Sequence, residues 1–115
     1  MAEQECIFCR IGRGEVPSEF FYRDEVVFVI GNINPEAPVH LLVIPFAHVE
    51  ALAEEPGESL ATLHALFAGA AGGAREAGVA NQGYRLVVNQ GPNAGQEVTH
   101  LHMHLLAGRR LGGMG

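Results

Sequence analysis

Apolar residues change their spacing several times along this 115-residue chain, and each spacing predicts a type of secondary structure. Segments rich in aromatic and β-branched residues, or with apolar residues at alternate positions, have the composition of strands. Five segments fit this description: 20–23, 25–30, 40–44, 84–89 and 99–107. The third is almost continuously apolar, which predicts burial on both of its faces.

A longer, helical periodicity follows Gly57. Apolar residues recur there at intervals of three and four, and they predict one apolar helix face made of Leu60, Leu63, Phe67, Ala70, Ala71 and Ala74. Gly78 is expected to end this helix, while Gly72 and Gly73 inside it each cost up to about 1 kcal/mol relative to alanine. Either the helix weakens there or another part of the chain packs closely against these two glycines, and we favour close packing.

The remaining stretches are short. Residues 6–12 predict one or two helical turns, and residues 34–38 (NPEAP) predict a loop. Five strands and one main helix with short connections indicate an α+β fold with an antiparallel sheet, and the length suits a single domain spanning 1–115. No apolar stretch approaches the roughly 18 residues that cross a bilayer, and the start (MAEQECIFCR) lacks the pattern of a secretory signal. We expect a soluble, cytosolic protein.

The charge narrows the choice of partners. Seven arginines, no lysines and thirteen acidic residues give a net charge of -6, which opposes binding to nucleic acid or to an anionic membrane. A phosphate group bound by such a protein has to be held locally, by backbone N–H groups and histidines with one arginine at most.

The candidate chemistry lies near the C-terminus, where three histidines alternate with apolar residues. Alternate side chains of a strand share a face, so His100, His102 and His104 are expected to project together, opposite Leu101 and Met103. A lone histidine on an apolar face is usually a partly buried residue with its hydrogen bonds satisfied. Three in register favour a functional site, because burying a polar face costs free energy unless each ring is hydrogen-bonded.

Two kinds of chemistry use such a row of imidazoles. One is a metal site, because neutral imidazole is a common ligand and a His-x-His pair can chelate an ion. The other is nucleophilic catalysis at phosphorus, in which one imidazole attacks while a backbone carbonyl holds its other nitrogen and a neighbour steadies the phosphoryl oxygens. The preceding loop, residues 89–97 (NQGPNAGQE), favours the second, because glycines let backbone N–H groups approach an anion and amides add neutral donors.

At this point the sequence resembles the histidine-triad (HIT) family and, within it, the Hint branch of nucleotide-binding hydrolases. The resemblance extends over most of the chain: 6–11 (CIFCRI), 33–45 (INPEAPVHLLVIP) with His48, 83–91 (GYRLVVNQG), 95–96 and 100–106 (HLHMHLL). It implies a five-stranded antiparallel sheet with one main helix and a short N-terminal helix. It also implies a homodimer that joins two such sheets into one of ten strands.

The resemblance also implies an activity, the hydrolysis or transfer of a nucleoside monophosphate group at a P–N or phosphoanhydride bond. A purine nucleoside phosphoramidase acting on adenosine phosphoramidate-type substrates, with no organic cofactor, is the leading expectation. His102 matches the family's nucleophile, which forms a nucleotidyl-histidine intermediate, His104 its contact to the α-phosphate, and His40 its supporting histidine. The other positions that match nucleotide contacts are Asn32, Ile33, Asn89, Gly95, Gln96, Glu97 and Val98.

Three positions depart from the family pattern. Asn32 stands where Hint members usually carry an aspartate that binds the ribose hydroxyls, so the charge is lost although an amide can still accept a hydrogen bond. Glu97 stands where many members have a serine near the leaving group, and its carboxylate either repels phosphate or assists proton transfer. The tail 108–115 (GRRLGGMG) lacks the tryptophan and prolines that are frequent there.

Cys6 and Cys9 have the Cys-x-x-Cys spacing of a metal knuckle. A redox motif is expected between a strand and a helix, whereas this pair opens the chain, and a reducing cytosol disfavours a disulfide. The resemblance supplies two further ligands, His48 and His100, and thus a structural Zn²⁺ site. His64, within the main helix, is expected at the surface or at its boundary with the core.

Two other functions compete with the phosphoramidase. A nucleotide-binding regulatory or interaction protein with little turnover is suggested by the departures at Asn32 and Glu97. A metalloenzyme whose three histidines hold one catalytic ion is the other, but it leaves the glycine-containing loop unexplained.

Overall fold

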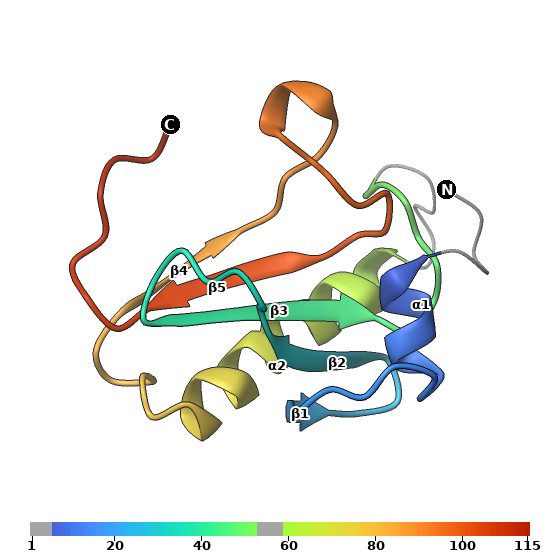
Figure 1. Ribbon diagram of the computed structural model, residues 1–115, viewed down its shortest axis with the longest axis horizontal. Helices are drawn as coiled ribbons and strands as arrows, with labels where there is room; N and C mark the ends of the chain where they lie inside the picture. Colours follow the sequence, from blue (N-terminus) through green and yellow to red (C-terminus); the bar gives the residue numbers. More distant parts are fainter. Residues whose placement is uncertain (1–5, 53–58) are drawn as a thin grey trace.

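The computed structural model describes residues 6–52 and 59–115 of the chain. It contains α1 (Ile7–Gly12), β1 (Phe20–Arg23), β2 (Val27–Gly31), β3 (Val39–Pro45), α2 (Ser59–Glu76), β4 (Tyr84–Val87), the short 3-10 turn η2 (Pro92–Ala94) and β5 (Met103–Ala107). The strands form one antiparallel sheet in the order β1-β2-β3-β5-β4 (Figure 1). The predicted α+β fold, with one main helix and a short N-terminal helix, is confirmed.

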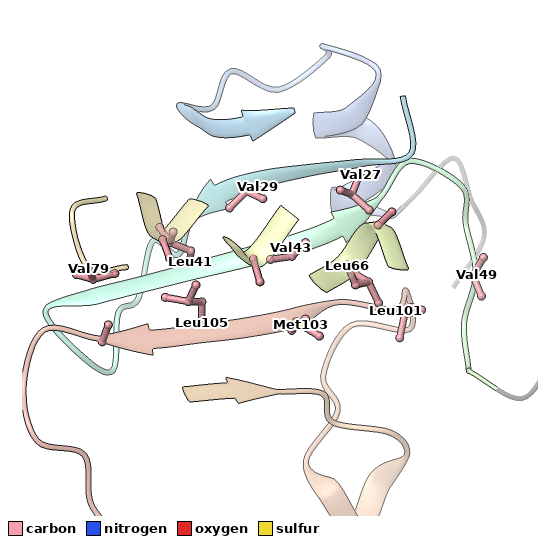
Figure 2. Packing of buried hydrophobic residues seen from close by; sticks show 14 residues of the cluster. Val27, Val29, Leu41, Val43, Val49, Leu66, Val79, Leu101, Met103 and Leu105 are labelled. Atoms are coloured by element: carbon pink, nitrogen blue, oxygen red, sulfur yellow. The ribbon is translucent and has the colours of Figure 1, made fainter. Parts of the chain in front are cut away.

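The two helices pack against opposite faces of the sheet. Strand side chains alternate between these faces, so that Val27, Val29, Leu41 and Val43 share a core with α2. Their neighbours Phe28, Ile30, Leu42 and Ile44 share a second core with α1. Figure 2 shows the first core, in which Leu66 lies with Val43, Met103 and Leu105. The central strand β3 is thus buried on both faces, as its continuous apolar sequence predicts.

The predicted apolar face of the main helix is confirmed in part. Its members Ala70 and Ala74 are buried in the α2 core and Leu63 packs against it. Leu60 is instead 76% exposed and Phe67 is 57% exposed, whereas Leu66, which was not predicted, is buried. Apolar residues at intervals of three and four are compatible with two adjacent helix faces that share Leu63, one through Phe67 and one through Leu66. The helix uses the face that carries the small residues, because these let it approach the β-branched side chains of the sheet. Gly57, after which the helix was predicted to begin, lies outside the described residues, and His64 is exposed.

The glycines inside α2 are where another element packs closely, as expected. A Cβ added to Gly72 would overlap the ring of Tyr22, and one added to Gly73 would lie 3.0 Å from Cγ1 of Val29. The helix ends at Glu76, and Gly78 follows with φ of 75° while the N–H of Val79 donates to the carbonyl of Ala74. The glycines thus set the distance between helix and sheet.

The observed strand bounds agree with the predicted ones to within a few residues, except in the strand that carries the histidines. This strand, β5, begins at Met103 rather than at the predicted residue 99, so His100 and His102 precede it. Continuing the register beyond the Val43–Met103 pair would place Leu101 opposite Pro45, which has no N–H to donate. The N–H of Leu101 instead donates to the carbonyl of Val49 at 2.6 Å. Leu101 still joins the α2 core.

No helix within 6–52 or 59–115 is long and apolar enough to cross a membrane.

Candidate functional site

A cavity of about 690 Å³ lies on the α1 side of the sheet, a size typical of small-molecule sites. Its walls come from α1, the end of β2 with the following loop, β3, β5 and the loop before the histidines. All the residues predicted for catalysis or nucleotide contact line it: Asn32, Ile33, His40, Asn89, Gly95, Gln96, Glu97, Val98, His102 and His104. Their individual roles stay predictions, but the fold brings them to one place.

His102 is held by the backbone on one side of its ring. Its Nδ1 lies 2.7 Å from the carbonyl oxygen of His100, so Nδ1 carries the proton and donates it. The neutral ring then has a lone pair on Nε2. The ring is 7% exposed, and the ring centroids of Phe8 and His104 each lie 5.1 Å from it. This is the arrangement that the sequence analysis required of an attacking imidazole.

His104 and His40 form a hydrogen-bonded pair. The backbone N–H of Glu36 donates to Nδ1 of His40 at 3.0 Å, so the ring proton of neutral His40 lies on Nε2. Nε2 of His40 is 2.8 Å from Nδ1 of His104 and donates to it. His104 therefore carries its own proton on Nε2.

Both rings of this pair are held neutral. Burial, followed by the nearby His102 and His40, lowers the pKa of His104 to about 4. Burial also lowers the pKa of His40, although the carboxylate of Glu36 acts in the opposite direction. Near neutral pH, His104 can therefore donate one N–H to a bound group without bringing a positive charge.

The loop before the histidines is shaped by its own side chains and glycines. Gly91 and Gly95 have φ of 86° and 84°, a conformation that favours glycine. The N–H of Gly91 donates to Oε1 of Gln96 at 2.8 Å, and Nε2 of Gln96 donates to the carbonyl of Val98 at 3.1 Å. The Gln96 amide thus spans the loop, which adds a shaping role to its predicted contact with nucleotide.

Sequence reasoning missed the apolar wall of the cavity. Side chains of α1, of the segment between α1 and β1, and of the strands form it: Ile7, Phe8, Ile11, Val16, Pro17, Ile30, Leu42, Val87 and Leu106. The alternation in β3 could have revealed part of this wall, because Leu42 shares a face with His40. Among the described residues that line the cavity, Glu36 and Glu97 are the only ones with carboxylate or basic side chains other than histidine.

The four predicted metal ligands converge beside the cavity. The donor atoms of Cys6, Cys9, His48 and His100 all lie within 4.8 Å of one another, and three of the four residues are buried. Nδ1 of His100 is 3.3 Å from Sγ of Cys6 and 3.5 Å from Sγ of Cys9, and Nδ1 of His48 is 3.2 Å from the latter. Tetrahedral zinc with bonds of about 2.3 Å to sulfur and about 2.0 Å to nitrogen has S···N edges of about 3.5 Å.

The opposite ring nitrogens support the same geometry. Nε2 of His100 lies 2.8 Å from the carbonyl oxygen of Pro45, and Nε2 of His48 lies 3.2 Å from Oε2 of Glu50. These contacts hold each proton on Nε2 and leave the Nδ1 lone pair for a metal. The quartet therefore fits a tetrahedral metal ion. Within the described ranges, His100 groups with the cysteines rather than with His102 and His104, which argues against one catalytic ion held by all three.

The chain is similar to known proteins along nearly its whole length. A model of the HIT domain matches residues 13–111. The purine nucleoside phosphoramidase of Escherichia coli (strain K12) is 43% identical over 114 residues, which cover 99% of this chain and 95% of that protein. A HIT family hydrolase from Clostridium thermocellum has a TM-score of 0.90 at 42% identity, with 96% of each chain covered. A Zn-bound histidine triad family protein from Mycobacterium smegmatis has a TM-score of 0.77 at 35% identity, covering 94% of this chain and 78% of its own. This chain belongs to the HIT family.

Proposed function

We propose that this protein is a purine nucleoside phosphoramidase, which hydrolyses the P–N bond of adenosine phosphoramidate-type substrates through a nucleotidyl-histidine intermediate. The observation that carries the proposal is the orientation of His102. Its Nδ1–H is held by the His100 carbonyl at 2.7 Å, and the ring lines the cavity. This leaves a neutral, oriented Nε2 as the nucleophile, without a separate general base. The relative named purine nucleoside phosphoramidase supports the choice of substrate.

The reaction has two steps. Nε2 of His102 attacks the α-phosphorus, a bond forms between nitrogen and phosphorus, and the P–N bond to the leaving amine breaks while that amine takes up a proton from solvent. Water then attacks the same phosphorus and the bond to His102 breaks, which releases the nucleoside monophosphate, returns one proton to solvent and restores neutral His102. His104 donates its Nε2–H to a phosphoryl oxygen, and His40 orients it.

The rest of the cavity binds the substrate. In this proposal, Asn32 and Ile33 contact the nucleoside, and the loop residues Asn89, Gly95, Gln96, Glu97 and Val98 surround the phosphate and leaving group. Neutral donors suit this role, because the described lining contains no arginine. The apolar wall from α1 suits a purine base.

The proposal includes a structural Zn²⁺, a homodimer and a cytosolic location. Cys6, Cys9, His48 and His100 would hold the zinc, whose role would be to tie α1 to the segment before β5.

In the proposed homodimer, the edge strand β4 would pair with β4 of a second copy to make a sheet of ten strands. Exposed Leu60 and Phe67 on α2 and Tyr84 on β4 supply apolar surface for such an interface.

The test is turnover of adenosine 5'-phosphoramidate by the parent protein and by His102→Ala. We expect a loss of at least about 10³-fold in kcat/KM, because the nucleophile is removed. His64→Ala, which changes an exposed histidine of α2, is the control and should retain full activity. Mass spectrometry of parent protein that is quenched with denaturant at alkaline pH, where a phosphorus–imidazole bond survives, should find adenylate on the peptide that contains His102.

Equal turnover by the parent and His102→Ala would refute the proposal. Tight nucleotide binding with negligible single-turnover chemistry in the parent would select the nucleotide-binding regulatory protein instead.

A further inference from the structure

Asn32, in the loop after β2, faces the histidine pair as well as the cavity. Its Oδ1 accepts a hydrogen bond from the N–H of Asn34 at 2.8 Å, so its amide nitrogen points the other way. That nitrogen, Nδ2, lies 3.3 Å from Nε2 of His40. The same Nε2 lies 2.8 Å from Nδ1 of His104. Nε2 of His40 therefore has two neighbours: the amide nitrogen of Asn32, which can only donate a hydrogen bond, and Nδ1 of His104, which can accept one.

Counting protons decides which neighbour receives the hydrogen bond. The N–H of Glu36 occupies Nδ1 of His40, so the proton of neutral His40 is on Nε2. Asn32 presents an N–H₂ group to this N–H and cannot accept from it, because its oxygen is turned toward Asn34. His104 offers a lone pair on Nδ1. The proton of His40 therefore goes to His104 alone.

We propose that Asn32 is a positioning residue for His104, which acts by facing His40 with an amide N–H₂ group in place of a carboxylate. The amide leaves the His40 N–H entirely to His104, and this fixes His104 as a neutral ring with its proton on Nε2. The meaning of that proton for catalysis rests on the proposed function, in which it is donated to a phosphoryl oxygen. The hydrogen-bonded arrangement itself does not depend on the enzyme's activity.

A carboxylate at position 32 would act in the opposite direction. Its first oxygen could keep the bond to Asn34, while the second would lie near Nε2 of His40 and compete for its proton. A negative charge within about 4 Å also favours the protonated form of an imidazole, by about one to three pKa units. The pair would then hold an additional proton at a pH where the parent pair is neutral.

The other charged groups near His40 and His104 are the same in the parent and in an Asn32→Asp variant. Burial lowers the pKa of both rings; the carboxylate of Glu36 partly opposes this effect at His40, and His102 adds to it at His104. Glu97 lines the same cavity, and the guanidinium of Arg109 donates to the Glu36 carbonyl at 3.3 Å. A difference between the parent and Asn32→Asp therefore reports on position 32.

The test is a pH titration of the nucleotide-free protein, followed by ¹⁵N NMR of the imidazole rings. In the parent, we expect both His40 and His104 in the tautomer with the proton on Nε2. In Asn32→Asp, we expect the pKa of the pair to rise by about one unit or more. Asn34→Asp, which adds the same charge two residues along the loop, is the matched control and should cause a smaller rise.

A second variant separates charge from the loss of the amide. Asn32→Ser keeps a hydroxyl oxygen for the N–H of Asn34 but faces His40 with neither an amide nor a charge, so its pair should titrate between the parent and Asn32→Asp. A parent His40 with its proton on Nδ1, or equal shifts in Asn32→Asp and Asn34→Asp, would overturn the inference. Because no substrate is present, neither result depends on whether the protein is a phosphoramidase.

Discussion

The two ends of the histidine run have the same residue type and share one side of the chain, yet they are built for different chemistry. His100 is fully buried, with one nitrogen toward the thiols of Cys6 and Cys9 and the other at a backbone carbonyl. His104 is partly exposed to the cavity and has one nitrogen bonded to His40. The first end uses both ring nitrogens to join parts of the fold. The second leaves one nitrogen for a ligand.

His102 connects these two ends. Its Nδ1 donates to the carbonyl of His100, and its ring contacts that of His104. Phe8, from the helix that carries Cys9, packs edge-on against both His100 and His102. The comparison shows that an imidazole acquires its chemistry from its partners, because the alternation along the chain is the same throughout. Both ends can be tested separately.

The largest expected effect is a difference in stability between His100→Ala and His104→Asn. His100→Ala removes one donor of the proposed zinc site, leaves a cavity and deprives the Pro45 carbonyl of its donor, so we expect the free energy of unfolding to fall by about 3 kcal/mol or more. His104→Asn keeps an acceptor for His40 and should cost less than about 1 kcal/mol. Urea denaturation in the presence of Zn²⁺ measures both values.

A chelator sharpens this result. It should lower the stability of the parent and of His104→Asn, which retain the four ligands, but leave His100→Ala almost unchanged. Similar losses in the two variants, or no effect of the chelator on the parent, would remove the distinction between a structural end and a ligand-binding end.

The sequence predicts that His100 has a different role from His102 and His104, but it does not predict how the three rings are arranged. Each element type was predictable because apolar periodicity reflects which faces are buried, and the quartet was predictable because the family resemblance supplied His48 and His100. The start of β5 was not, because it depends on Pro45, which lies on a partner strand far away in the sequence. The orientation of α2 was not, because the choice of face depends on what the glycines contact.

The bond between His40 and His104 was equally hidden. The two residues are 64 positions apart, and their tautomers follow from the backbone N–H of Glu36, which no pattern of side chains reveals. The resemblance gave His40 a supporting role, but only the register Leu42–His104 places the two rings on one face of neighbouring strands. Long-range register is the part of the site that local sequence does not encode.

The next effect is a dependence of stability on pH that comes from the His104 end. Burial holds the pKa of folded His104 at about 4, below the value near 6.5 of an unfolded histidine. Between these values the unfolded chain binds a proton that the folded protein does not, so stability is fully present above about pH 6.5 and is lost as the pH falls toward 4. We expect His104→Asn to reduce this loss in urea denaturation series from pH 7 to pH 4.5.

The difference between two proteins isolates this contribution. The parent and His104→Asn share the sulfur–imidazole quartet, whose own response to acid is the same in both and cancels. His64→Asn, at an exposed position on α2, is the control and should follow the parent. Parallel curves for the parent and His104→Asn would mean that His104 binds protons equally in the folded and unfolded states.

The smallest effect concerns the two imidazoles at the structural end, which differ in their outer partners. Nε2 of His48 donates to the carboxylate of Glu50, whereas Nε2 of His100 donates to a neutral carbonyl. A carboxylate makes the ligating ring more basic, so Glu50→Gln, which keeps an acceptor but removes the charge, should raise the zinc dissociation constant about tenfold. Competition with a chromogenic chelator measures this constant.

Glu76→Gln, at the end of α2, is the matched control for charge. Glu50 does not line the cavity, so turnover by Glu50→Gln at saturating zinc should equal that of the parent. A change in turnover would mean that the metal-site residues influence catalysis by a route other than the His100 carbonyl.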